Sequence, residues 1–139
     1  MDPAELKTRT KALAVVVVGF VEKLERTSSV DIIGKQLVRS ATSVAANYRA
    51  ACRSRSKADF VNKLGIVEEE ADETVFWLEL LLDCRKVEPD EVAPMMDEAD
   101  QLVRIISASR ITARRNMPRK LEPNQSFNRQ STIEYRQSH

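Results

Sequence analysis

The stretch from Gln36 to Leu82 most constrains the fold, because two helical patterns of different character follow one another within it. The first is rich in alanine and serine, whereas the second is acidic and ends in aromatic residues and leucines. The two patterns meet at residues 53–56, where Arg-Ser-Arg-Ser interrupts both apolar stripes. Small side chains let neighbouring backbones approach closely. We therefore expect these two helices at the centre of an all-α, antiparallel up-down four-helix bundle.

A third helical pattern precedes this stretch, from about Pro3 to Arg26, with Asp2 as its expected N-cap. The four consecutive valines at 15–18 would also suit a strand, but the surrounding 3.6-residue stripe favours a helix. Residues 27–29 form the predicted break after it.

Caps and breakers predict the other helix boundaries. We expect the second helix from Val30 or Asp31 to Arg53, the third from a cap at Ser54 or Ser56 to residues 84–86, and the fourth from residues 88–90 to about Arg115.

The apolar periodicity ends at the C-terminal region, where Met117 and Pro118 stop the last helix. The chain has 139 residues and a net charge of +1, but residues 117–139 hold four basic residues against two acidic ones. We therefore expect one bundle domain over residues 1–116 and a flexible, basic, polar tail over residues 117–139.

Nothing in the sequence indicates export or membrane insertion. The N-terminus lacks the charged and apolar regions of a signal peptide, and the apolar run at 12–18 is too short to cross a bilayer. Cys52 and Cys84 lie in helical patterns without metal-type spacing, and are expected to be reduced thiols. The sequence therefore predicts a cytoplasmic protein.

The acidic run Glu68, Glu69, Glu70, Asp72 and Glu73 raises the question of a di-metal site, since bundle glutamates bind metals in ferritin-like proteins. That motif needs histidine, and the one histidine of the chain is His139. Successive helix residues also point about 100° apart, so adjacent glutamates diverge. A Ser–His pair and a glycine-rich phosphate loop are missing too. We therefore expect no enzymatic activity, no cofactor and no metal.

Two basic clusters are candidates for nucleic-acid contact, because arginines and lysines neutralise phosphates. They comprise Arg49, Arg53, Arg55 and Lys57 in the first cluster, and Arg110, Arg114, Arg115, Arg119 and Lys120 in the second. The second leads into the basic tail and is the better candidate of the two. In an alternative interpretation, Arg49 and Arg53 form salt bridges with the 68–73 carboxylates of the next helix.

Apolar residues outside the core stripes form a candidate oligomer interface. They are Val15, Val16 and Val18 in the first helix, and Ile66, Trp77 and Leu80 in the third. Each helix of a bundle buries one face well, so an apolar surplus indicates a partner surface. A wide apolar stripe in a tightly packed monomer would account for the same residues equally well.

The segments Ser-Val-Ala-Ala-Asn (43–47) and Ser-Lys-Ala-Asp-Phe (56–60) resemble the small proteins encoded in intervening sequences of bacterial 23S rRNA genes. The resemblance extends loosely over residues 5–116. It implies a four-helix bundle and a homo-oligomer, pentameric in some relatives. Accessory proteins of diversity-generating retroelements are similar in fold and bind nucleic acid and a reverse transcriptase. The tail beyond Met117 exceeds the resemblance.

These observations lead to one functional hypothesis and one alternative. The chain is expected to be a non-enzymatic, homo-oligomeric, RNA- or DNA-associated accessory protein of the bacterial cytoplasm. The alternative is a protein-binding scaffold without nucleic-acid contact, for which a protein encoded by a neighbouring gene is a candidate partner.

Overall fold

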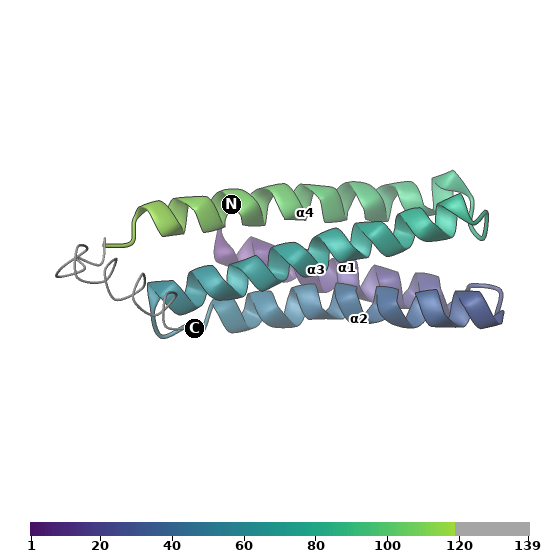
Figure 1. The fold of residues 1–139 in the computed structure, drawn as a ribbon, viewed down its shortest axis with the longest axis horizontal. Helices are drawn as coiled ribbons and strands as arrows, with labels where there is room; N and C mark the ends of the chain where they lie inside the picture. The colour runs from purple at the N-terminus through teal and green to yellow at the C-terminus, as the bar shows by residue number, and fades with distance from the viewer. Residues whose placement is uncertain (119–139) are drawn as a thin grey trace, which may run out of the picture.

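The computed structural model describes residues 1–118, which form four α-helices without a strand (Figure 1). The helices are α1 (Pro3–Glu22), α2 (Ser28–Ala51), α3 (Lys57–Asp83) and α4 (Pro89–Arg115). The prediction of an all-α protein with four helices is confirmed. The predicted tail lies almost entirely outside the described residues. No helix within residues 1–118 is long and apolar enough to cross a membrane.

The start of each helix is fixed by an oxygen that accepts its first free N–H groups. The Asp2 carboxylate accepts the N–H of Ala4 at 2.7 Å, as the sequence predicts, and Ser56 caps α3 through the N–H of Asp59 at 3.1 Å. Helix α2 begins at Ser28, earlier than expected, because Thr27 in the predicted break is its N-cap.

Helix α1 ends at Glu22, four residues before the predicted end. The N–H groups of Lys23 and Leu24 bond to the carbonyls of Phe20 and Val21, which tightens and closes the last turn. Leu24 is half-buried and still packs against the core, so its apolar character reflects a core contact made from a turn rather than a further helical residue.

Each helix packs chiefly on its neighbours in sequence: α1 on α2, α2 on α3, and α3 on α4. Helices α2 and α3, from the central stretch of the sequence, share the most extensive contact, whereas α1 and α4 share the smallest contact among the four pairs that touch. The α1–α2 and α3–α4 turns lie at one end of the molecule, and the α2–α3 turn lies at the other (Figure 1).

The core between the helices is apolar, with one interior hydroxyl pair and one further buried threonine, Thr10, as exceptions. Its largest fully buried side chains include Leu37, Leu64, Leu78, Leu81, Leu102 and Ile106. Ser40 of α2 and Thr74 of α3 are both fully buried and lie 3.0 Å apart between their hydroxyl oxygens. Ser40 also bonds to the Leu37 carbonyl and Thr74 to the Glu70 carbonyl, so neither hydroxyl is left without a partner.

Candidate nucleic-acid interface

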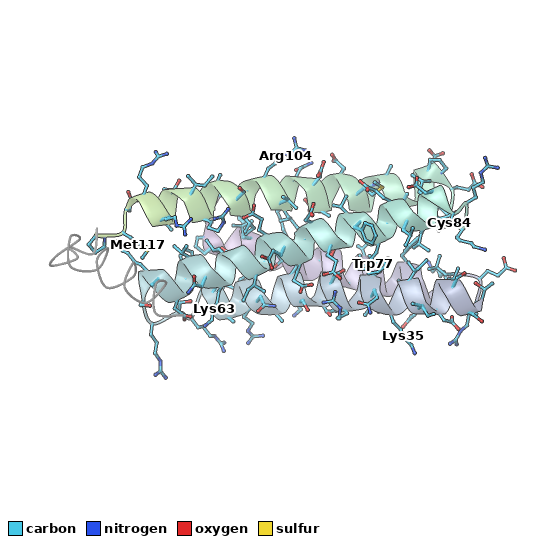
Figure 2. All side chains as sticks on the ribbon, viewed as in Figure 1. Lys35, Lys63, Trp77, Cys84, Arg104 and Met117 are labelled. Carbon is cyan, nitrogen blue, oxygen red and sulfur yellow. The ribbon has the colours of Figure 1, made fainter. Side chains whose placement is uncertain are left out.

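The charges of the bundle are divided between its two halves. The N-terminus of α1 and the C-terminus of α4 lie toward the same end of the bundle as the α2–α3 turn (Figure 1). Met117 marks this end, and Cys84 marks the other end (Figure 2). We call residues 1–11, 45–66 and 107–118, which surround this end, the basic half. They hold eleven cationic side chains and three carboxylates, Asp2, Glu5 and Asp59. The other described residues hold seven cations and sixteen carboxylates.

A groove in the basic half collects four cations from α1, α2 and the turn after α2. It lies between α1 and α2, encloses about 570 Å³, and is lined by Lys7, Thr8, Lys11, Ala45, Ala46, Arg49 and Arg53. We call it the basic groove. Its four cationic side chains are exposed, and none forms an ion pair within residues 1–118. No carboxylate lines the groove. The arrangement therefore concentrates positive charge that the described protein does not neutralise locally.

The acidic run of α3 takes other partners than Arg49 and Arg53. Arg39 of α2 bonds to Glu70 at 3.0 Å and also to Glu73, and Arg110 of α4 bonds to Glu68 at 2.8 Å. The alternative in which Arg49 and Arg53 form these bridges is wrong, because the α2–α3 register places Arg39 beside the run.

The ion pair between Arg39 and Glu73 shifts the pKa of both side chains. Its hydrogen bond to Glu73 raises the pKa of Arg39, and the same bond, with one from the Trp77 indole at 3.1 Å, lowers the pKa of Glu73. Burial opposes both shifts. The network holds α2 against α3 and leaves Arg39 unavailable for phosphate.

Arg55 and Lys57 line a second hollow, at the α2–α3 turn. Tyr48 and Phe60 contribute to its wall, and it encloses about 400 Å³. Burial raises the pKa of Tyr48, so its phenol stays neutral at physiological pH. This hollow lies in the same basic half as the basic groove, and Arg55 and Lys57 add to the positive charge there.

The second predicted cluster is split by the fold. Arg110 is half-buried in its bridge to Glu68, beside a carboxylate-rich hollow between α3 and α4. Arg114 and Arg115 are exposed in the last turn of α4, where the helix dipole favours cations. Arg119 and Lys120 lie outside the described residues. Arg114 and Arg115 thus remain as free cations of this cluster within residues 1–118.

Comparison with known proteins decides the family. The profile of the 23S rRNA-intervening sequence protein family matches residues 4–108, about three quarters of the chain. The chain belongs to this family. A solved structure of a protein of unknown function, from the S23 ribosomal protein family of Bacteroides thetaiotaomicron, is similar with a TM-score of 0.74. The two chains are 30% identical, over 79% of this chain and 98% of that one. No curated protein matches.

The family match covers the whole basic groove of this 23S rRNA-intervening sequence protein, whereas Arg110, Arg114 and Arg115 lie beyond its end at residue 108. Sequence reasoning missed Lys7 and Lys11. Their spacing of four residues on the first helix was the available signal, since it places both on one helix face. That this face borders Arg49 and Arg53 depends on the α1–α2 register, which no local pattern contains.

The predicted interface residues of this family member fall into two classes. Val15, Val16 and Ile66 are exposed, at 64%, 54% and 44%. Val18, Trp77 and Leu80 are half-buried, and the last two pack against the core. Sequence reasoning missed Phe76, which is 50% exposed and meets Trp77 edge-to-face at 4.9 Å. Exposed apolar surface thus lies on both α1 and α3, which do not pack on each other.

Proposed function

We propose that this family member is a homo-oligomeric, antiparallel up-down four-helix bundle that associates with RNA or DNA in the bacterial cytoplasm and catalyses no reaction. The basic groove is the observation that carries the proposal. Four exposed cations from α1, α2 and the turn after α2 surround it, without a carboxylate in its lining. Such a concentration of unpaired cations attracts polyanions.

Charge segregation supports the same proposal at longer range. A net charge of +1 gives the chain no general attraction for nucleic acid. The carboxylate-rich half repels phosphates while the basic half attracts them, so a polyanion would approach one end of the bundle. This orientation depends on ionic strength, because salt screens it beyond about 10 Å at 0.1 M.

Exposed apolar side chains support self-association. Val15 and Val16 on α1, and Ile66 and Phe76 on α3, form separate surfaces. Two different surfaces on one subunit suit a head-to-tail interface, which closes into a ring when the rotation between subunits permits. We propose this arrangement for the oligomer, and a ring of five is one such closure.

The proposal assigns no catalytic residue, cofactor or metal. Within residues 1–118, no three His, Cys, Asp or Glu side chains come together as metal ligands. The carboxylates most suggestive of such a site, Glu68, Glu70 and Glu73, form ion pairs with arginines. The sequence also gives no support for a Ser–His or Cys–His nucleophile, since its one histidine is residue 139.

Fluorescence anisotropy with labelled RNA and DNA oligonucleotides tests the nucleic-acid association. The test variant carries Lys7→Gln, Lys11→Gln, Arg49→Gln and Arg53→Gln. The matched control carries Lys23→Gln, Arg26→Gln, Arg85→Gln and Lys86→Gln, which removes four exposed cations from the turns at the opposite end. Wild type should bind with an affinity that falls steeply with salt, by about 0.7–0.9 in log–log slope for each phosphate contact. The test variant should lose most of this binding, and the control should retain it.

Wild type that ignores both RNA and DNA at low salt would overturn the proposal. The protein-binding scaffold would then be the better account, with the exposed apolar surfaces as its sites and a protein encoded by a neighbouring gene as the first partner to try. Equal losses in the test variant and the control would show attraction by overall charge alone.

A further inference from the structure

The four cations of the basic groove form two rows. Lys7 and Lys11 line its α1 wall, and Arg49 of α2 and Arg53 of the turn after α2 line the other wall. Lys7 and Lys11 are four residues apart on one helix face, offset by about 6 Å along the axis. Arg53 is also four residues from Arg49, and its N–H bonds to the Ala50 carbonyl at 3.0 Å, so the backbone continues from the helix into a tightened last turn. Neighbouring phosphates of a nucleic-acid strand have a spacing of the same order. The groove therefore presents two successive positions for an anion.

The register of α1 and α2 determines which cations face each other. A methyl group at Gly34 would lie 3.0 Å from Cγ1 of Val21, so these residues are in direct apposition. Because α2 runs back alongside α1 from their shared turn (Figure 1), residue 11 lies across from residue 44 and residue 7 from residue 48. Helical side chains lean toward their own N-terminus. This lean brings Lys11 toward Arg49 and Lys7 toward Arg53.

The floor of the groove offers little with which to read bases. It consists of Thr8, Ala45 and Ala46, and the Thr8 hydroxyl donates to the Ala4 carbonyl at 3.0 Å. No aromatic ring, amide or carboxylate lines the groove. Base stacking needs an aromatic face, and pairing with adenine or cytosine edges needs an amide or a carboxylate, and the groove lining has none of these. Arginine and lysine can pair with a guanine edge, so contact with the backbone alone requires all four cations to be engaged on phosphates.

We propose that the basic groove holds one phosphodiester strand, with one phosphate between Lys11 and Arg49 and the next between Lys7 and Arg53, and reads no bases. This inference rests on the proposed association with nucleic acid and specifies its ligand. A single strand and one strand of a duplex offer the same chemistry, so both are used as probes.

Anisotropy titrations at several salt concentrations test the two clamps in the full chain. The probes are labelled 12-nucleotide oligo-dT, oligo-dA and oligo-U, and a 12-base-pair DNA duplex. The clamp variants are Lys11→Gln with Arg49→Gln, and Lys7→Gln with Arg53→Gln. The row variants are Lys7→Gln with Lys11→Gln, and Arg49→Gln with Arg53→Gln. Each pair removes two charges, so the four variants are matched in net charge.

A clamp variant frees one phosphate completely, so its salt slope should fall by about 0.7 on a single strand. A row variant leaves one cation on each phosphate and should weaken binding with a smaller change in slope. The two substitutions of a clamp should be coupled in a double-mutant cycle, and those of a row independent. The three homopolymers should bind within about threefold of one another, as expected for phosphate contacts alone.

Equal slopes and equal coupling in clamp and row variants would overturn the paired clamps, even where wild type binds. A preference above tenfold among the homopolymers would overturn backbone-only recognition. Either result leaves the association with nucleic acid intact, whereas wild type that binds no probe removes both proposals. Tight binding of oligo-dT with weak binding of the duplex assigns the groove to single strands, and comparable binding assigns it to one strand of either form.

Discussion

Glu73 shows how one residue can connect two helices and an aromatic side chain. Its carboxylate accepts from Arg39 on α2 and from the Trp77 indole one turn along α3. The exposed fraction of its side chain is 35%, so solvent screens the bridge and its contribution to stability is small. The bridge nevertheless determines which arginine of α2 pairs with the acidic run of α3, namely Arg39.

The lowered pKa of Glu73 predicts how this bridge responds to pH. A carboxyl whose pKa is lower in the folded than in the unfolded protein stabilises the fold above its unfolded value, about 4.3. This stabilisation is lost as the pH falls through the folded pKa. Glu73→Gln should therefore reduce the free energy of unfolding by about 0.5–1 kcal/mol at pH 7. Urea unfolding at pH 7 and pH 3 should show a smaller difference between variant and wild type at pH 3. An equal difference at both pH values would contradict an ionic origin.

At the residue scale, the sequence predicted side-chain types better than side-chain partners. Asp2 and Ser56 are caps as expected, because a cap depends on its own helix alone. That Arg110 pairs with Glu68, while Arg49 pairs with no carboxylate within residues 1–118, was not predictable, since pairing depends on how far one helix slides along another. Arg39 was never considered as the partner of the acidic run, although it takes both Glu70 and Glu73.

At the scale of elements, the end of α3 contains a residue in an unfavourable conformation. Arg85 has φ 56°, the left-handed region that favours glycine. The N–H of Lys86 bonds to the Leu81 carbonyl and the N–H of Arg85 to the Leu82 carbonyl, which is the Schellman pattern that requires this conformation. The turn into α4 thus places an arginine where a residue without Cβ would fit best.

Arg85→Gly should raise the free energy of unfolding by about 0.5–1 kcal/mol, because it removes the left-handed strain of a residue with Cβ. Lys86→Gly is the matched control, since Lys86 does not have positive φ and gains only backbone freedom in the unfolded chain. Chemical denaturation should place Arg85→Gly above wild type and Lys86→Gly below it. The reverse order would show that the arginine side chain contributes more than its backbone strain costs.

Helix existence was predictable throughout, whereas helix ends were less so. The bounds of α4 agree with the prediction. Its start is set by a capping box of Glu88 and Glu91, which depends on residues close to each other in the sequence. Helix α1 ends four residues early, since Leu24 fits the apolar stripe yet lies in a turn. A periodic apolar residue indicates contact with the core, and a residue in a turn can make that contact as well as a helical residue can.

At the scale of the whole molecule, the exposed valines of α1 predict the behaviour of the oligomer. Val16→Asp places a charge on a surface proposed to be buried between subunits, where an unpaired charge is strongly unfavourable. Light scattering should give a mass several times 15.8 kDa for wild type and a smaller mass for Val16→Asp. Ile32→Asp, at an exposed isoleucine of α2 outside the proposed interface, should leave the mass unchanged. A monomeric wild type would contradict the proposed oligomer.

Helix α1 has the weakest attachment of the four, because its packing on α2 is less extensive than that of α4 on α3, and its contact with α4 is sparse. Local stability follows packing, so amide protons of α1 should exchange with deuterium before those of α2 and α3. The lysine wall of the basic groove thus belongs to the segment that opens most readily, and the arginine wall to one of the most protected. A ligand that contacts both walls would connect α1 to the more stable α2. Amide exchange should then slow along the whole of α1, although the ligand contacts only about one turn of that helix.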